Sequence, residues 1–318
     1  MSALANHSLS THSSNHLRPF DSHRDLGAVA DLVELCFADT LDESGRGYVQ
    51  RMRQAARSNS LFGWTNMSMG GFVWDRDGRV VGNVNLIPFT TRGNRNFLVA
   101  NVAVHPACRR QGIARSLTNQ AVERGRQLGM KSVWLHVREE NEAAVSLYQS
   151  LGFAERLRRT SWLSGSELPG VDKKPGVTLS SSRGRDWELQ LQWLSANYPP
   201  EVTWQSAMSF DALRPGFIGA LYRFLYSLGT LQWSAWVGNR LAASVSWQAS
   251  FGSAHSLWLA SPPDADENAL RLLLLHARRQ VPSHRPLEFD FPAGQSRQAI
   301  AQAGFTAQQT LIWMELPL

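Results

Sequence analysis

One stretch of the chain places basic side chains and small residues between a predicted strand and a predicted helix. Residues 105–125 have the sequence HPACRRQGIARSLTNQAVERG. The β-branched and apolar run 97–104 predicts a strand that ends at the His-Pro pair. Apolar residues near spacings of four and seven after Gly112 predict a helix with one buried face. The basic residues therefore stand where the helix begins.

The start of this helix has the properties of an anion-binding site. The first backbone N–H groups of a helix have no partner within it and carry a partial positive charge, so such a terminus binds phosphate groups readily. Gly112 and Ala114 let a ligand approach the backbone, and Arg109 and Arg110 add positive charge. The alternative is an ordinary solvated turn.

The elements after this turn follow a regular order. Residues 131–137, KSVWLHV, predict a strand. In the stretch 138–153, REENEAAVSLYQSLGF, Tyr148 and the apolar residues follow helical spacing, with Asn141 as the N-cap and Gly152 as the stop. The order is strand, anion turn, helix, strand, asparagine, helix and a Gly-Phe pair.

With these residues in place, the chain resembles the GNAT superfamily of acetyl-CoA-dependent N-acetyltransferases. Two motifs carry the resemblance, and both lie within residues 15–165. The first fits the family's Arg/Gln-x-x-Gly-x-Gly/Ala turn at Arg109, Gly112 and Ala114. The second fits the family's Asn-x-x-Ala-x-x-x-Tyr-x-x-x-Gly-Phe helix at Asn141, Ala144, Tyr148, Gly152 and Phe153.

The resemblance implies a fold and a co-substrate. The fold class is α+β (mixed α/β), with a mostly antiparallel sheet whose strands four (94–104) and five (132–137) splay apart, and with flanking helices. Acetyl-CoA binds in such a fold without a metal, and its pantetheine arm pairs with the main chain of strand four by β-augmentation. The implied cofactor-binding residues are Val102, Val104, Arg109, Arg110, Gln111, Gly112, Ile113, Ala114, Arg115, Asn141 and Tyr148.

An amine that attacks a thioester must lose a proton, and the leaving thiolate must gain one. Tyr148 occupies the family's general-acid position, where its hydroxyl can donate to the sulfur. His136 is the candidate base, because its unperturbed pKa is near neutral and it lies on one strand face with Trp134. Some protein N-terminal acetyltransferases of the family carry a histidine in the same Leu-His-Val context. Glu139, Glu140 or an ordered water are the alternatives.

Tyr148, His136 and Asn141 form the predicted catalytic set. Asn101 stands where some relatives place a carboxylate, which moves the predicted base to His136 or to a water. Cys108 could be a nucleophile, but direct transfer from a thioester needs no enzyme thiol, so we expect an ordinary loop cysteine.

The composition limits the partners and the compartment. The chain has 318 residues, enough for about two domains, and a net charge of +6. Its basic residues lack the interleaved aromatics of RNA-binding sheets, so we expect no nucleic-acid partner, and the charge suits polyanionic coenzyme A. Two cysteines fit a cytoplasmic, reducing compartment. No apolar run predicts a membrane span and no signal peptide is apparent. An oligomer stays possible.

The pattern of elements occurs twice along the chain. We expect a flexible polar tail at 1–14, a catalytic domain at 15–165, a linker at 166–177 and a degenerate GNAT-like domain at 178–318. The polar composition of the tail extends to residue 19. Helices are expected at 21–41, 44–58, 185–200, 215–229, 268–280 and 294–303, hairpins at 70–91 and 230–250, and further strands at 255–263 and 286–291.

The second copy lacks the site residues of the first. Its positions equivalent to Tyr148 and Asn141 hold Ile300 and Ala293. The acids Asp264, Asp266 and Glu267 replace the glycine turn, where they would repel a pyrophosphate and cap the helix instead. We therefore expect one acetyl-CoA per chain. The tryptophans of its hairpin are expected mainly in the core, with a wall of the acceptor cleft as the alternative: Trp233, Trp236 and Trp247.

The sequence thus predicts an N-acetyltransferase that transfers an acetyl group from acetyl-CoA to a primary amine of a small molecule or peptide. A silent acyl-CoA-binding sensor or scaffold is the first alternative, and a nucleic-acid-binding protein is the second. The acceptor stays open among a peptide N-terminus, lysine, an aminoglycoside, a polyamine and an amino acid.

Overall fold

The computed structural model describes residues 15–39, 41, 43–58, 70–170, 176–204, 210–214, 216, 229–250, 252–281 and 285–318. The chain forms two compact units. Unit 1 contains residues 1–89, 95–134 and 317–318, and unit 2 contains 90–94 and 135–316. The loop 59–69 and most of the predicted helix 215–229 lie outside the described residues.

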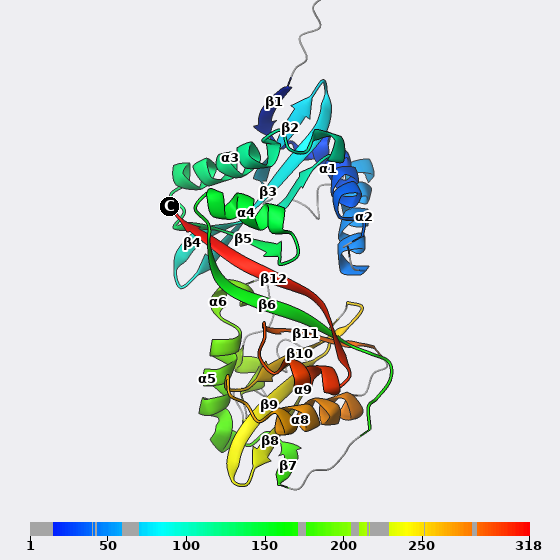
Figure 1. Cartoon of the computed structure of the whole chain (residues 1–318), viewed down its shortest axis with the longest axis vertical. Coiled ribbons are helices and arrows are strands. Elements are labelled where there is room, and N and C mark those ends of the chain that lie inside the picture. The colour runs from blue at the N-terminus through cyan, green and yellow to red at the C-terminus, as the bar shows by residue number, and fades with distance from the viewer. Residues whose placement is uncertain are drawn as a thin grey trace, which may run out of the picture. The chain divides into compact units, whose positions relative to one another are not determined.

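Unit 1 is a sheet with helices on both faces (Figure 1). Its strands occur in the order β1-β2-β3-β4-β5, and the last two residues of β3, the first residue of β4 and the last four of β5 belong to unit 2. The elements are β1 (Asn15–Pro19), α1 (Ser22–Phe37), α2 (Glu43–Ser58), β2 (Gly70–Arg76), β3 (Arg79–Thr91), β4 (Asn94–Val104), the 3-10 turn η2 (Pro106–Cys108), α3 (Ile113–Gln127) and β5 (Ser132–Arg138).

Local sequence explains these elements. Asp21 caps α1, because its carboxylate accepts the backbone N–H of His23 at 2.9 Å. Asp77 and Gly78 both have positive φ angles, as a two-residue hairpin turn requires. Val73 packs with α1 and α2 on one face. On the other face a Cβ at Gly82 would come within 2.8 Å of Ile113 on α3, so the strand needs glycine there.

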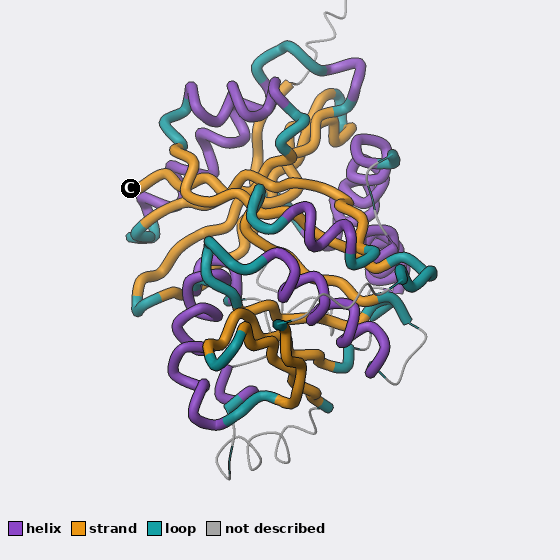
Figure 2. Tube along the Cα trace, turned by 60° about the horizontal axis from the view of Figure 1, so that its bottom comes forward, coloured by secondary structure: helices purple, strands orange, loops and turns teal. Residues whose placement is uncertain are grey.

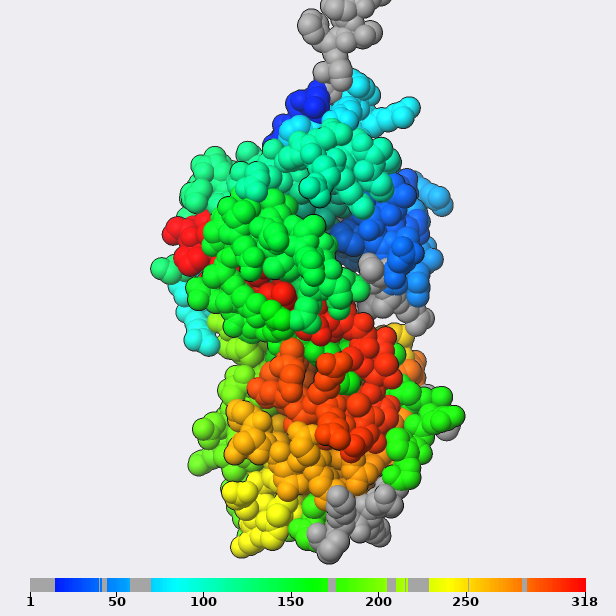
Figure 3. Space-filling view, in the orientation of Figure 1, coloured from blue at the N-terminus to red at the C-terminus, as the bar shows by residue number. Residues whose placement is uncertain are grey.

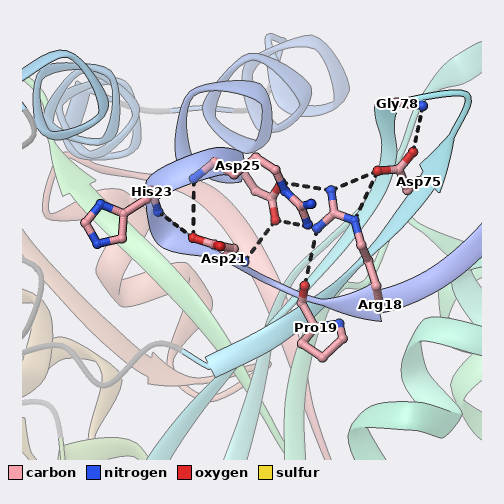
Figure 4. A network of polar contacts seen from close by, with 8 residues as sticks. Arg18, Pro19, Asp21, His23, Asp25, Asp75 and Gly78 are labelled. Atoms are coloured by element: carbon pink, nitrogen blue, oxygen red, sulfur yellow. Dashed lines mark hydrogen bonds and ion pairs between the residues drawn. The ribbon is translucent and has the colours of Figure 1, made fainter.

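The polar composition of residues 1–19 favours a flexible tail, but residues 15–19 form the strand β1. Residues 15–19 pair antiparallel with β2, and Leu17 lies opposite Trp74. Figure 4 shows why this polar segment is held: the Arg18 guanidinium lies between the carboxylates of Asp25 and Asp75, at 2.6 and 2.9 Å. The Asp25 and Asp75 side chains are 1% and 9% exposed, so they need a cationic partner.

The strands of unit 2 pair in the order β5-β12-β6-β11-β10-β9-β8-β7. Its elements are α4 (Glu142–Ser150), β6 (Ala154–Ser164), β7 (Val177–Ser181), η3 (Gly184–Asp186), α5 (Trp187–Asn197), α6 (Pro200–Thr203), η4 (Phe210–Leu213), β8 (Thr230–Val237), β9 (Arg240–Gln248), β10 (His255–Ala260), α8 (Glu267–Gln280), β11 (Leu287–Pro292), α9 (Arg297–Gln302) and β12 (Phe305–Pro317).

Helices cover both faces of this sheet (Figure 2). Successive side chains of β10 point to opposite faces of the sheet. Leu257 and Leu259 pack in the core that contains α8 and α9. Trp258 and Ala260 pack against α5 on the other face. The hairpin tryptophans at 233, 236 and 247 are all buried, as expected of core residues.

The C-terminal strand β12 has no counterpart among the predicted elements. It lies between β5 and β6, and β6 in turn lies between β12 and β11. The β6–β12 ladder is antiparallel and extends from the pair Phe305–Ser164 to the pair Glu315–Ala154. The last strand of each half of the sequence therefore pairs with strands from the other half. The boundaries at 165 and 178 stay predictions about the repeats, because the two units divide the chain at other residues.

The two hairpins share one irregularity. In β2–β3 the register shifts between Trp74 and Asp75, so that Val81 is the extra residue. In β8–β9 it shifts between Ala235 and Trp236, so that Ala242 is extra. Both bulges stand at the same distance from the arginine that opens the second strand, as expected of a duplicated element.

Replacing Arg18 with Met is expected to lower the free energy of unfolding by about 3–5 kcal/mol, because two buried carboxylates lose their common partner. Urea unfolding at neutral pH measures the change. Arg24→Met is the control: its side chain also contacts Asp25 but is 58% exposed, and such pairs contribute less than about 1 kcal/mol.

Wild type and Arg18→Met also test how the free energy of unfolding depends on pH. Burial opposes ionisation of Asp25, but hydrogen bonds from Arg18 and from the Asp21 amide outweigh it and bring the pKa of Asp25 below its usual 3.8. A carboxylate with a lowered pKa stabilises the fold above its unfolded pKa, and this contribution is lost as the pH falls through the folded pKa. The difference between wild type and Arg18→Met should shrink in acid; a difference that stays constant as the solution is acidified contradicts the assignment.

Candidate functional site

The turn between β4 and α3 has an unusual backbone. Arg110 and Gly112 both have positive φ angles, +62° and +77°. Gly112 is the N-cap of α3, and no side chain caps the helix. The first N–H groups of α3 are therefore left without a side-chain acceptor, which is the condition for anion binding at a helix start.

Neighbouring side chains hold this turn in shape. Arg76 donates from Nη2 to Gln111 Oε1 at 2.7 Å and from Nη1 to Cys108 Sγ at 3.4 Å. Arg109 Nε donates to the Val104 carbonyl at 3.2 Å. Cys108 is buried, so the predicted loop cysteine is a packed residue under the turn. Arg76 is a site residue that the sequence analysis missed.

The open side of the turn fits a diphosphate. A Cβ built at Gly112 would have no heavy atom within 4 Å, and the side chains of Arg109 and Arg110 are exposed. Ile113 is 2% exposed, so it can offer only its backbone amide. The turn thus combines a helix start without a side-chain cap, two exposed arginines and room for a ligand.

Two side chains hydrogen-bond to the carbonyl at the end of β4, where a pantetheine arm is predicted to pair. The Val104 carbonyl accepts a second hydrogen bond, from Cys36 Sγ at 3.3 Å. Cys36 lies on α1 and is half-buried. The Val104 carbonyl is therefore already occupied by two donors.

A buried network of asparagines fixes the middle of β4. Asn83 Nδ2 donates to the Asn101 carbonyl at 3.0 Å and to Asn85 Oδ1 at 2.9 Å, and Asn101 Nδ2 donates to Asn85 Oδ1 at 3.2 Å. Asn101 has a φ of +51° inside the strand. Asn83 and Asn85 are fully buried. The sequence analysis missed this network. Its signal was the pair Asn83 and Asn85 at alternate positions of the otherwise largely apolar strand β3.

Tyr148 lies in unit 2 on α4, a helix at the molecular surface (Figure 3). Its side chain is 7% exposed and packs edge-on against Phe153, with ring centroids 6.0 Å apart. Desolvation by burial raises the pKa of Tyr148 to about 12. The phenol therefore keeps its proton at neutral pH and can donate it.

Asn141 is the N-cap of α4, as predicted from sequence. Its Oδ1 accepts the N–H of Ala144 at 3.2 Å, and the residue is exposed. The carbonyl oxygen of its side chain therefore holds the helix, and a contact with a ligand would have to use Nδ2.

His136 is the exposed residue within the otherwise buried strand 132–137. Its ring lies against Trp313 of β12, with centroids 5.0 Å apart and a tilt of 33°. Desolvation lowers the pKa of His136, and the charge of Asp290 opposes this shift. The imidazole is thus neutral near neutral pH. Glu139, one of the alternative bases beside Glu140 and water, forms an ion pair with Arg158.

The second half of the chain is arranged differently at the equivalent helix start. Asp266 caps α8, because its Oδ1 accepts the N–H of Ala269 at 2.7 Å. Glu267 accepts the N–H of Ala299 at 3.0 Å. The predicted self-capping is confirmed for Asp266, whereas the hydrogen bond of Glu267 goes to α9 rather than to α8. Ile300, at the position equivalent to Tyr148, is fully buried in the core.

Two kinds of feature are absent from the ranges that the structure describes. No three His, Cys, Asp or Glu side chains gather there as a possible metal site. None of the helices in those ranges is long and apolar enough to cross a membrane.

Comparison with known proteins gives a family match for part of the chain. Residues 31–153 match the family model of the Acetyltransferase (GNAT) family. The ribosomal protein bS18-alanine N-acetyltransferase of Escherichia coli (strain K12) is 40% identical over 62 residues, which make up 20% of this chain and 42% of that enzyme. The match thus spans less than half of the relative's length.

Solved structures show the same fold for the whole chain. A tandem GNAT protein from the clavulanic acid biosynthesis pathway has a TM-score of 0.52 at 18% identity, and the match covers 96% of this chain and 98% of that one. A GCN5-related N-acetyltransferase from Sphaerobacter thermophilus has a TM-score of 0.55 at 14% identity, with 95% of each chain covered. Residues 31–153 therefore match the GNAT acetyltransferase family, and the chain has a mixed α+β fold like that of solved GNAT structures.

Proposed function

We propose that this protein is an N-acetyltransferase that transfers the acetyl group of acetyl-CoA to a primary amine. The uncapped start of α3 at Gly112 carries the proposal. It supports binding of a diphosphate because it combines free amides, two exposed arginines and open space, while the equivalent helix α8 is capped by its own acids.

In this proposal the turn residues bind and orient the co-substrate. The backbone amides of residues 112–114 bind the diphosphate, and the exposed side chains of Arg109 and Arg110 supply positive charge beside it. The amides of Val102 and Val104 align the pantetheine arm along β4. When bound, acetyl-CoA supplies an activated thioester.

His136 and Tyr148 move the protons. The neutral imidazole of His136 accepts the proton of the attacking ammonium, directly or through a water, because desolvation holds its pKa below the usual value. Tyr148 donates its phenolic proton to the departing thiolate, because burial keeps the phenol protonated. Asn141 positions α4, and with it Tyr148, as the helix cap.

The acceptor is proposed as a primary amine of a peptide or small molecule. The relative from Escherichia coli is named for an alanine of a ribosomal protein, which supports a peptide N-terminus as one member of this class. Release of free thiol from acetyl-CoA over an amine panel tests the function. Binding of acetyl-CoA without thiol release from any amine would support the alternative of a sensor or scaffold.

Gly112→Asp is expected to weaken acetyl-CoA binding about 100-fold or more, because a carboxylate would face the diphosphate. Gly112→Asn is the matched control, since asparagine has the same shape and tolerates a positive φ. Isothermal titration measures the affinities and should count one acetyl-CoA per chain. Equal affinities of the two variants would contradict the site, and two cofactors per chain would contradict the assignment of α8.

Tyr148→Phe is expected to lower kcat about 100-fold or more with little change in acetyl-CoA affinity, because a positioned general acid is lost. Steady-state thiol release measures kcat. Tyr198→Phe is the control, since burial also raises the pKa of Tyr198 to about 12 but its hydroxyl accepts the Leu259 amide. A normal kcat in Tyr148→Phe would show that Tyr148 is not the general acid.

The pH profile of kcat/KM tests His136. Because its pKa lies below the usual 6.5, the rate should stay level around neutral pH and fall only as the pH drops below about 6.5. His136→Ala should lose this acid limb and most of the activity. His276→Ala is the control, because burial also lowers the pKa of His276 but it lies on α8. An unchanged profile in His136→Ala would assign the base to water or Glu140.

A further inference from the structure

An exposed carboxylate stands on the sheet of unit 2 without an ion-pair partner among the described side chains. Asp290 lies opposite Ser161 in the antiparallel pairing of β11 and β6. The Ser161 hydroxyl donates a hydrogen bond to Asp290 Oδ1. Phe289 and Phe291 on either side of Asp290 point into the core that contains α8. Asp290 therefore belongs to the opposite face of the strand.

Arg159 fixes the backbone at this point. Its Nη2 donates to the Asp290 carbonyl at 2.8 Å and its Nη1 donates to the Asn197 carbonyl at 2.5 Å. Its guanidinium also lies over the Tyr198 ring, 5.1 Å from the centroid. Arg159 is only 5% exposed. It therefore holds the backbone of Asp290 in place, while the carboxylate itself stays open to solvent.

The strand registers put Asp290 on the same face as His136. Leu157, Arg159 and Ser161 alternate along β6 and so share one face. Leu157 is paired with Trp313 of β12, and the ring of Trp313 contacts His136. The charge of Asp290 also raises the pKa of His136 against the effect of burial. The carboxylate and the imidazole are therefore within electrostatic reach of each other.

The chemistry of this face suits a cation. The carboxylate attracts an ammonium group, and the half-buried Trp313 offers an aromatic surface on which a cation is stabilised. An amine whose own carboxylate is adjacent would bring a second negative charge toward Asp290, which is unfavourable. The face thus favours acceptors in which the group next to the amine is neutral.

Building on the proposed acetyltransferase function, we propose that Asp290 is a specificity-determining residue that binds the ammonium group of the acceptor. Ser161 orients the carboxylate, Trp313 covers the alkyl part of the acceptor, and His136 then takes the proton. The substrate class is a cationic amine without an adjacent carboxylate, such as a peptide N-terminus or an amino acid amide, rather than a free amino acid.

The test compares L-alanine amide with L-alanine as acceptors. The wild-type enzyme should prefer the amide about 10-fold or more in kcat/KM. Asp290→Asn should raise KM for the amide about 10-fold, reduce the preference below about 3-fold and leave the KM of acetyl-CoA unchanged. Asp290→Glu should keep part of the preference. Glu288→Gln is the matched control, because it removes the same charge from an exposed residue on the same face of β11.

A second measurement separates this inference from the proposed function. NMR titration of the His136 ring should show a lower pKa in Asp290→Asn, and alanine amide should shift this resonance in wild type but not in the variant. Thiol release from no amine at all would contradict the proposed function. Active enzyme with the same acceptor preference in Asp290→Asn, or an equal NMR response of both proteins to the amide, would overturn the role of Asp290.

Discussion

The antiparallel ladder between β6 and β12 is the constraint on which unit 2 depends. A strand inside a sheet must pair on both edges, because an unpaired buried backbone group is costly. The return of β12 satisfies the edges of β5 and β6 together. It also sets the register that lays Trp313 against His136 and places Ser161 beside Asp290. The environment of the candidate base thus depends on the last strand of the chain.

In unit 1, side-chain hydrogen bonds support two backbone positions with positive φ, one inside β4 and one in the turn before α3. Asn101 and Arg110 are non-glycine residues with positive φ, a conformation that costs about 1 kcal/mol or more each. The asparagine network secures the first, and hydrogen bonds from Arg76 and Arg109 secure the turn that contains the second. These contacts keep the start of α3 open without a cap.

The two halves of the chain show how a duplicated fold can keep its core and change its site. Both hairpins bulge at the same place, and Asn83 and Asn85 correspond to Ser244 and Ser246 by their distance from the bulge. The start of α8 differs, because the Asp266 carboxylate accepts the Ala269 amide that an anion would otherwise contact, and Glu267 adds a negative charge in the first turn. The difference in capping, together with Ile300 and Ala293 at the positions of Tyr148 and Asn141, underlies the expectation of one cofactor site rather than two.

The sequence by itself determined the features that depend on neighbours in the chain. The left-handed glycine before α3, the caps at Asp21 and Asn141, the hairpin turns and the repeated order of elements follow from local spacing and backbone preference. Tertiary structure decided what depends on residues far apart. The pairing of β12 with β5 and β6, the strand at residues 15–19, and the position of Asp290 on the face of His136 arise from contacts between segments that are distant in the chain. Such contacts leave no periodic signal, because the partner strand supplies the hydrogen bonds and the charge that a segment lacks by itself.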